Sequence, residues 1–527
     1  MTSAPLPRVT YTNIREDFSG VHRRLDAGIA AFEREHLGAR WPHWIDGRPH
    51  HAGADRPIDS PIDRRIRLGA GGDGDAATVD AAITAARRAQ PEWAAGGWQQ
   101  RVATLRAVAD AIEASKWELG IAMIFEVGKS RIEAMGEVEE SIDMIRFYCD
   151  EMQAHEGFTR PMRRAFAHEA TTDTLRPYGV FGVIAPFNYP VALSIGMSTG
   201  ALLGGNTVVL KPSPGAGLTA TWLARAFAAG GVPPGVFNVV LGGNGTGRLL
   251  AAAGVDGIAF TGSLDTGMTL LRGVAAGPHM RPVIAEMGGK NPCYVTASAD
   301  LDAAAEGVFR SAYGMQGQKC SALSRVLVHR DVAEAFVERL LARIDAASIG
   351  DPRDARHFIG PLINEAALAR YLKGLADARE DGRLLAGDTP LRGGPFDHGH
   401  YVKPMLVADL PADHRLNRAE QFLPLLTLTR FDDLADAIRD GNAIEFGLTA
   451  GIYTRSEAEL QRFLDTAQAG VLYANRASGA TTGAWPGIQS FCGWKGSGAG
   501  GKGGLGGHYL PQFMREQSWT IIRDGVV

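Results

Sequence analysis

The chain has 527 residues, of which 45% are hydrophobic and 21% are charged. This composition excludes a disordered protein and is sufficient for two or three globular domains. The formal net charge of −4 provides no general attraction for nucleic acid or for anionic membranes, so we expect neither as a partner.

The protein is predicted to be soluble and its first part to be helical. Its N-terminus carries acidic and basic residues where a signal peptide needs an apolar core, and no later apolar run is long enough to span a bilayer. Alanine-rich helices are expected from residue 77 to 93 and from 100 to 150, with an interruption at Gly128 and Lys129. Four cysteines without paired spacing favour a reducing cytoplasm and predict neither disulfides nor a metal site.

TTDTLRPYGV (residues 171–180) has the composition of a strand, as does HYLPQFMREQSWTII (508–522) near the C-terminus. Both segments lie outside the helix and strand alternation of the rest of the chain, so they are predicted to pair with each other or with another subunit. We expect an oligomerisation element and a homodimer or a dimer-based homo-oligomer. The nearby basic residues, which alternate with apolar ones, favour a solvated strand face over a polyanion site: Arg160, Arg163, Arg164 and His168.

Residues 178–287 alternate short buried strands with helices. GVFGVIAP, NTVVLKPS, GVFNVVLGG, GVDGIAFTGS and RPVIAEMGG are the predicted strands. This alternation is typical of an α/β fold with a Rossmann-type, doubly wound parallel sheet, whose ligands bind at the carboxyl ends of the strands. No G-x-G-x-x-G motif follows the first strand, where the sequence is PFNYP instead.

A second α/β domain is expected from about Gly288, because the alternation continues to about residue 490. Near the C-terminus, GWKGSGAGGKGGLGG is so rich in glycine that it must be a loop.

Two positions in the first domain are candidates for phosphate binding. Ser263 follows a strand in FTGSLDTG and opens a helix, which suits a pyrophosphate, although a plain N-cap explains it equally well. Lys211 ends a buried strand and could reach a ribose or a phosphate, whereas the alternative is an ordinary surface lysine.

Two further residues are candidates for catalysis. Glu286 ends a strand before two glycines and could act as a general base if it is partly desolvated. Cys320 lies in GMQGQKCSALSR, a stretch predicted to be a loop entering a helix, so that the helix dipole and Lys319 would lower its pKa. Each residue alone also has an ordinary structural explanation, and for the cysteine this is a small buried apolar side chain.

Taken together, six motifs resemble the aldehyde dehydrogenase superfamily over residues 40–520. They are PFNYP, KPSP, FTGS, EMGGKNP, GQKCSA and EQF, in the family's order and approximate spacing. The resemblance implies a NAD(P)-binding domain (residues 1–157 and 179–287), a catalytic domain (288–490), and an oligomerisation element with the C-terminal tail (158–178 and 491–527).

The resemblance also implies roles for single residues. Cys320 matches the nucleophile, Glu286 the base that activates the deacylating water, and Asn188 the oxyanion-binding residue. The positions that match cofactor contacts are Lys211, Ser213, Thr261, Gly262, Ser263, Gly267, Gly288, Glu420 and Phe422. NAD is the expected cofactor, and NADP stays open because Pro214 replaces an acidic residue that often selects NAD.

Within the superfamily, residues 126–148, 317–322 and 481–498 resemble the glutamate-semialdehyde (1-pyrroline-5-carboxylate) dehydrogenases. By this resemblance Ser321, Gly483 and Ala484 anchor the substrate carboxylate, and Tyr189 and Phe491 form its aromatic walls. Glu126 is the predicted partner of the substrate ammonium group.

The expected reaction is oxidation of an aldehyde to a carboxylate through a cysteine thioester, with L-glutamate γ-semialdehyde as the expected substrate. Ser490, Cys492 and an apparent insertion at 477–480 depart from the family pattern and favour a different, larger ω-aldehyde acid as an alternative. A further alternative is transfer of the acyl group to CoA. That reaction would not need a base to activate water, so the presence of Glu286 counts against it. A non-catalytic protein of the same fold would have no reason to retain Cys320, Asn188 and Glu286 together.

Overall fold

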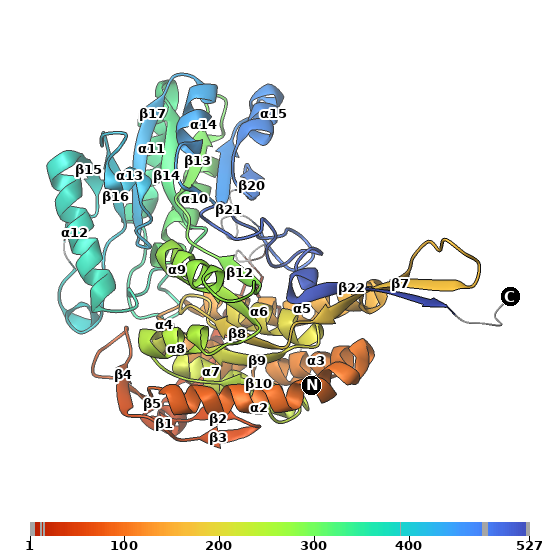
Figure 1. Cartoon of the computed structure of the whole chain (residues 1–527). Helices are drawn as coiled ribbons and strands as arrows, with labels where there is room; N and C mark the ends of the chain where they lie inside the picture. The colour runs from red at the N-terminus through yellow and green to blue at the C-terminus, as the bar shows by residue number, and fades with distance from the viewer. Residues whose placement is uncertain (1–5, 11–12, 14–15, 390, 477–482, 523–527) are drawn as a thin grey trace.

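The computed structural model describes residues 6–10, 13, 16–389, 391–476 and 483–522. Two seven-stranded sheets form two lobes, and a narrow arm projects from the lower lobe (Figure 1). No helix within these ranges combines the length and the apolar composition needed to cross a membrane. All four cysteines are unpaired, as predicted.

The sheet of the first lobe has the order β12-β11-β8-β9-β10-β2-β3. Its first five strands are parallel, as predicted, and β2 and β3 extend it in antiparallel fashion. In this order the strands are β12 (Val283–Glu286), β11 (Gly257–Thr261), β8 (Val180–Ile184), β9 (Thr207–Lys211), β10 (Phe237–Val239), β2 (His43–Ile45) and β3 (Arg48–His50). Every residue of β9 is buried because helices cover both faces of a parallel sheet.

The helices of the first lobe follow the predicted alternation and include the long N-terminal helices. The crossover helices are α6 (Ala192–Leu203), α7 (Gly217–Ala229), α8 (Asn244–Ala252) and α9 (Leu264–Ala275). The preceding helices are α1 (Ser19–His36), α2 (Ala76–Ala95), α3 (Gly97–Ala114), α4 (Lys116–Val127) and α5 (Arg131–Ala154). Gly128 ends α4 in a left-handed conformation with φ 73°, which confirms the predicted interruption. A small sheet, β1 (Ala39–Trp41), β5 (Arg67–Gly72) and β4 (Asp55–Asp59), lies beside them.

The sheet of the second lobe has the order β15-β16-β17-β14-β13-β19-β20, and all its neighbours except β15 and β16 are parallel. Its strands are β15 (Arg383–Ala386), β16 (Met405–Ala408), β17 (Leu425–Phe431), β14 (Leu323–His329), β13 (Asn291–Val295), β19 (Thr449–Tyr453) and β20 (Val471–Ala474). The main helices are α10 (Leu301–Tyr313), α11 (Ala333–Asp345), α12 (Glu365–Asp381), α14 (Leu434–Asn442) and α15 (Glu457–Thr466).

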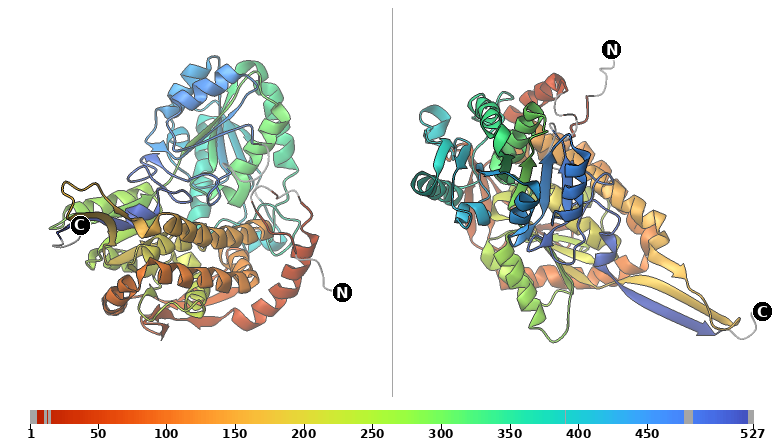
Figure 2. Two further views of the ribbon diagram at one scale, coloured as in Figure 1. Left: turned by 90° about the vertical axis from the view of Figure 1, so that its right-hand side faces the viewer. Right: turned by 90° about the horizontal axis from the view of Figure 1, so that it is seen from above.

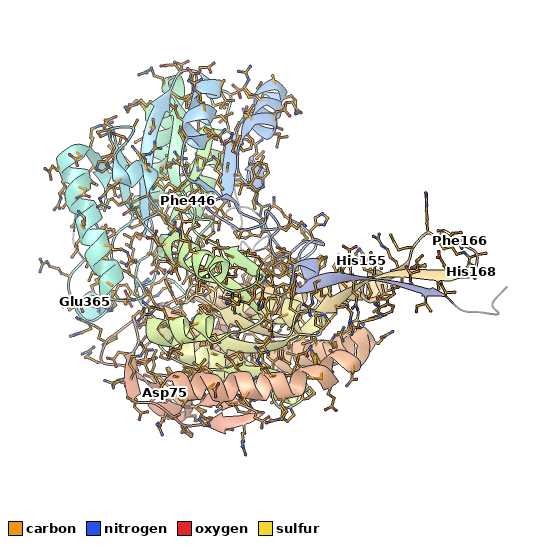
Figure 3. The ribbon with its side chains drawn as sticks, viewed as in Figure 1. Asp75, His155, Phe166, His168, Glu365 and Phe446 are labelled. Atoms are coloured by element: carbon orange, nitrogen blue, oxygen red, sulfur yellow. The ribbon has the colours of Figure 1, made fainter. Side chains whose placement is uncertain are left out.

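The arm confirms the predicted pairing of the two outlying segments. β22 (Met514–Ile522) pairs antiparallel with β7 (Glu169–Pro177) over its whole length, and β7 pairs with β6 (Thr159–Pro161). The view from above shows the arm extending away from both lobes (Figure 2), with Phe166 and His168 near its tip (Figure 3). The four residues of the predicted basic cluster lie in this arm and are all exposed, as expected for a solvated face.

Residues 491–513 differ from the prediction that grouped them with this element. Leu505, Tyr509, Leu510 and Phe513 are buried in the main core of the first lobe, and β21 (Trp494–Lys495) pairs with β18 (Phe446–Gly447) of the second. Only β22 therefore joins the arm. The glycine-rich stretch is a loop apart from these two strand residues, and it returns the chain from the second lobe to the first.

Candidate active site

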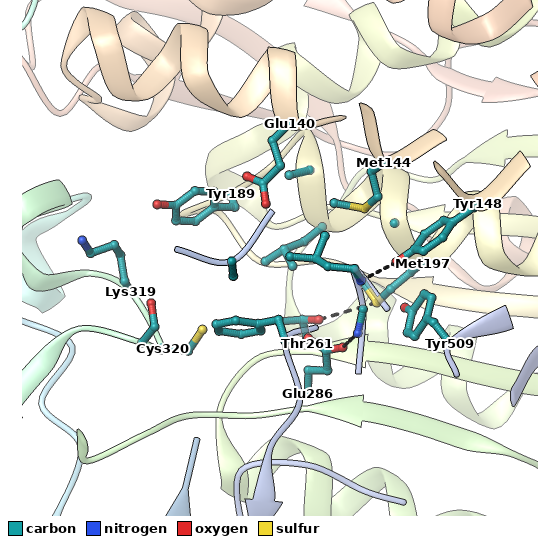
Figure 4. Close-up of a pocket in the computed structure, with 18 residues that line it drawn as sticks. Glu140, Met144, Tyr148, Tyr189, Met197, Thr261, Glu286, Lys319, Cys320 and Tyr509 are labelled. Atoms are coloured by element: carbon teal, nitrogen blue, oxygen red, sulfur yellow. Dashed lines mark hydrogen bonds between the residues drawn. The ribbon is translucent and has the colours of Figure 1, made fainter. Parts of the chain in front are cut away.

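One cavity gathers residues from both lobes around Cys320 (Figure 4). Lys319, Cys320 and Ser321 come from the turn before β14. Glu286 and Thr261 come from the carboxyl ends of β12 and β11, where a parallel sheet presents its ligands. The remaining walls come from α5, the loop before α6, α6 itself and the C-terminal loop: Glu140, Met144, Tyr148, Tyr189, Ala192, Leu193, Gly196, Met197, Ala484, Phe491, Gly504, Leu505 and Tyr509.

The environment of Cys320 differs from the sequence prediction. Cys320 lies in a turn that enters strand β14, so it does not begin a helix as predicted. Burial and the nearby carboxylates of Glu420 and Glu286 raise the pKa of the thiol to about 12. The N–H groups of Ser321 and Cys320 oppose this shift. The thiol is therefore protonated at neutral pH and needs a base to accept its proton.

Asn291 holds the Cys320 turn in place. Its side-chain nitrogen donates to the carbonyl oxygens of Cys320 at 2.8 Å and Ala322 at 2.9 Å, and its side-chain oxygen accepts from the Thr449 N–H at 3.0 Å. One buried amide thus ties the turn to strands β13 and β19. Sequence reasoning did not select this residue, although it belongs to the motif EMGGKNP.

Glu286 ends β12 and faces the cavity, as its position in the sequence predicted. Burial raises the pKa of its carboxyl to about 7, and the Gly504 N–H partly offsets this by donating a hydrogen bond of 3.0 Å. A carboxyl with this pKa is substantially ionised at neutral pH and can still accept a proton. Its environment therefore suits a general base.

Asn188 and Tyr189 occupy the bend between β8 and α6. Tyr189 lines the cavity, whereas Asn188 is buried and is not one of the wall residues. A buried network fixes the bend: Glu137 accepts from the Val191 N–H at 2.8 Å and the Ala192 N–H at 3.0 Å, and it pairs with Lys129. The Lys129 ammonium lies 3.6 Å from the centroid of the Tyr189 ring.

The predicted substrate residues divide into three groups. Ser321, Ala484, Phe491 and Tyr189 line the cavity, and Gly483 directly precedes a wall residue. The Cys492 thiol donates a hydrogen bond to the Gly470 carbonyl oxygen at 3.5 Å. Neither Cys492 nor Ser490 is a wall residue of the cavity. The insertion at 477–480 lies outside the described residues.

The predicted contact between Glu126 and the substrate is wrong. Glu126 is buried away from the cavity and accepts hydrogen bonds from the Leu218 N–H at 2.7 Å and from the N–H and hydroxyl of Thr219 at 2.8 and 2.6 Å. It therefore satisfies the N-terminus of α7. Glu140, which sequence reasoning missed, points into the cavity beside Tyr189 instead (Figure 4).

The predicted cofactor residues lie at the same edge of the first sheet. Lys211 ends β9 and is 4% exposed, so it is no ordinary surface lysine, and burial lowers the pKa of its amine to about 8. Ser213 caps a short 3-10 turn. Ser263 caps α9 by accepting from the Thr266 N–H at 3.4 Å, which confirms the N-cap interpretation without excluding a phosphate. Thr261, Gly262 and Gly267 surround the same helix start.

Glu420 lies against the backbone that follows Glu286. It accepts from the Gly289 N–H at 2.9 Å, and a Cβ atom on Gly288 would collide with its carboxylate, so a larger residue there would displace the Glu420 side chain. Burial raises the pKa of Glu420 to about 7. Phe422 has φ 57°, and its ring packs edge-on against Phe187 at 5.9 Å.

The start of α8 adds a second helix N-terminus that sequence reasoning missed. It follows β10 in the stretch GGNGTG, and Gly247 lies close to the Lys211 side chain. Two glycine-rich helix starts beside a buried lysine fit the phosphates and ribose of a dinucleotide. Within the described ranges no cluster of His, Cys, Asp and Glu could hold a metal ion.

Comparison with known proteins agrees with this geometry. Residues 56–518 match the model of the aldehyde dehydrogenase family. The chain belongs to this family.

Several aldehyde dehydrogenases are similar over most of their length. The 1-pyrroline-5-carboxylate dehydrogenase of Bacillus subtilis (strain 168) is 32% identical over 512 residues, covering 95% of this chain and 97% of that protein. The alpha-ketoglutaric semialdehyde dehydrogenase of the same organism is 34% identical over 424 residues, covering 80% and 86%. The structure of 1-pyrroline-5-carboxylate dehydrogenase from Thermus with bound NAD has a TM-score of 0.91 and 30% identity, and the match covers 99% of this chain and 100% of that one.

These findings establish an aldehyde dehydrogenase with the predicted α/β fold, and its cofactor is NAD(P). The groups that would hold it are the side chains of Lys211 and Glu420 and the backbone N–H groups at the starts of α8 and α9.

Proposed function

We propose that this aldehyde dehydrogenase oxidises L-glutamate γ-semialdehyde to L-glutamate in proline catabolism. One observation carries the proposal: a single cavity contains Cys320, Glu286, a hydroxyl at Ser321 and a carboxylate at Glu140. These groups match an amino-acid aldehyde. Cys320 and Glu286 act on the aldehyde carbonyl, the Ser321 hydroxyl donates a hydrogen bond to the substrate carboxylate, and the Glu140 carboxylate pairs with the substrate ammonium group.

In this mechanism Cys320 attacks the aldehyde carbon after losing its proton to Glu286, the cavity carboxylate with a pKa of about 7. The Cys320 N–H and the amide of Asn188 stabilise the resulting oxyanion. NAD(P)⁺ supplies the hydride acceptor when it is bound. Glu286 passes the thiol proton on to solvent, which returns it to the carboxylate form. It then takes a proton from the water that cleaves the Cys320 thioester, which releases the acid and the thiolate.

The substrate assignment is tested with a panel of aldehydes. Charge-assisted hydrogen bonds are worth about 1.5 to 3 kcal/mol each, so one or two of them favour glutamate semialdehyde over hexanal by roughly a hundredfold in kcat/KM. Ser321→Ala should reduce this ratio by lowering kcat/KM for glutamate semialdehyde only, and glutamate should inhibit competitively. Equal kcat/KM for both aldehydes would refute the assignment.

A different ω-aldehyde acid is the second candidate. The similarity to a ketoglutaric semialdehyde dehydrogenase favours it, whereas Ser490 and Cys492, which suggested it in the sequence, do not line the cavity. Such a substrate has no ammonium group, so Glu140→Gln would leave its KM unchanged while raising the KM of glutamate semialdehyde.

We also propose that the arm joins two copies of the chain in a cytoplasmic homodimer or dimer-based oligomer. Large apolar side chains are exposed along the arm: Met162, Phe166, Trp519, Ile521 and Ile522. Exposed apolar side chains on paired strands are typical of a subunit contact. Light scattering should find that Trp519→Ser combined with Ile521→Ser shifts the protein to a smaller assembly.

A further inference from the structure

A second cavity lies next to the catalytic one. The two cavities share Tyr189 and Lys319 in their walls. A surface groove in turn shares Arg131, Ala355 and His357 with the second cavity. The three spaces therefore form a series from the surface to Cys320, in which the second cavity is the middle chamber.

The middle chamber is rich in positive charge. Among the described residues of its wall, Lys319, Arg131, Arg310 and Arg356 are cationic and Glu133 is anionic, while His22 and His357 add two imidazoles. The carboxylates that pair with the three arginines, Asp26, Glu306 and Asp354, are not part of this wall. The wall of the chamber thus includes four cationic residues and one anionic residue, whereas the carboxylates that pair with the three arginines belong to residues outside the wall.

Lys319 stands between the middle chamber and the catalytic cavity. Its side chain is buried, and burial lowers the pKa of its amine while the charge of Glu133 partly offsets the shift. Figure 4 shows its ammonium directed away from the centre of the catalytic cavity. An incoming carboxylate would supply the desolvated ammonium with a charged partner.

We propose that the middle chamber is an anion-attracting vestibule that guides aldehydes carrying a distant carboxylate towards Cys320. It thereby selects ω-oxo carboxylates as a class against neutral aldehydes of the same length. A cavity lined by one sign of charge concentrates ligands of the opposite sign and raises their association rate, an effect that salt weakens. This inference deepens the proposed function and requires only that the enzyme oxidises aldehydes.

The test compares 5-oxopentanoate with pentanal, a pair that differs only in the carboxylate. Arg310→Gln and Arg356→Gln are combined. Glu306 keeps Arg343 as a partner at 3.1 Å, and the Arg356 side chain is 82% exposed, so the fold should persist. The double variant should lower kcat/KM for 5-oxopentanoate about fivefold to tenfold at low salt, with kcat for both aldehydes and kcat/KM for pentanal unchanged.

The control is Arg439→Gln, which also removes an exposed arginine paired with a nearby aspartate, Asp436, but far from the chamber in the sequence and fold. It should leave the ratio of kcat/KM for 5-oxopentanoate to kcat/KM for pentanal unchanged. Raising the ionic strength should weaken the preference of the wild-type enzyme for 5-oxopentanoate but not that of the double variant. An unchanged ratio in the double variant, or an equal loss for both aldehydes, would overturn the vestibule. The kcat/KM for glutamate semialdehyde is measured alongside and tests the proposed function independently.

Discussion

The side-chain amide of Asn291 donates a 2.8 Å hydrogen bond to the carbonyl oxygen of Cys320. The same nitrogen also bonds to the Ala322 carbonyl at 2.9 Å, so one buried side chain sets the conformation of the turn that carries the nucleophile. Asn291 acts on the reaction only through the position of Cys320.

The first prediction concerns this positioning. Asn291→Ala leaves two carbonyls of the turn without their donor, and should cost about 1 to 3 kcal/mol of unfolding free energy and lower kcat by at least about tenfold. Asn417→Ala is the matched control, since Asn417 is buried and donates to the Pro411 carbonyl at 2.8 Å outside the site. It should lose similar stability in urea unfolding but keep kcat. Equal kcat losses in both variants would indicate a general effect of destabilisation.

The second prediction separates the two cysteines nearest the site. Cys320→Ala should abolish aldehyde oxidation and leave the affinity for NAD nearly unchanged, because the thiol makes the covalent bond to the substrate. Cys492→Ala should retain turnover, since Cys492 is not a wall residue of the cavity. The measurements are absorbance at 340 nm and cofactor titration. Wild-type turnover in Cys320→Ala would rule out the covalent mechanism.

The third prediction follows from the carboxyl of Glu286, whose pKa is raised to about 7 by burial. Below this pH the carboxyl is protonated and cannot accept a proton, so kcat should fall as the pH drops through about 7. Glu286→Gln should remove this pH dependence and slow both half-reactions, because the variant lacks an acceptor for the Cys320 proton and a base for the deacylating water. NADH should therefore form slowly and without a burst.

Burial raises the pKa of Glu420 to the same value, so Glu420 would give the same pH dependence. Rapid mixing of the Glu286→Gln variant with substrate and NAD shows which steps depend on Glu286. A burst of NADH at the wild-type rate followed by slow turnover in Glu286→Gln would contradict acceptance of the Cys320 proton by Glu286 and would limit its role to deacylation.

The fourth prediction compares two buried glutamates. Glu126→Ala removes the acceptor of three hydrogen bonds at the start of α7 and should cost about 2 to 4 kcal/mol of unfolding free energy, with KM for glutamate semialdehyde unchanged. Glu140→Gln should instead raise the KM for glutamate semialdehyde about tenfold. Denaturant unfolding and steady-state kinetics decide between them. A raised KM in Glu126→Ala at full occupancy of the folded state would restore Glu126 to the substrate site.

Several features could be predicted from the sequence because local pattern determines them. The strand and helix alternation of residues 178–287 gave the parallel sheet, and with it the position of Glu286 and Lys211 at the carboxyl ends of β12 and β9. The strand-like composition of two outlying segments predicted their pairing, which the structure shows as β7 and β22.

Other features depended on tertiary contacts that no local pattern contains. Glu126 lies in α4, and Glu140 lies in the next helix, α5. Only the packing of these helices decided that Glu126 faces α7 while Glu140 faces the cavity. The environment of Cys320 was equally hidden, because the strand after its turn and the carboxylates of Glu286 and Glu420 come together only in the folded chain. The residue types and their order determined the family and the chemistry, whereas the charge state and reach of each group depend on burial and neighbours, which are properties of the three-dimensional fold.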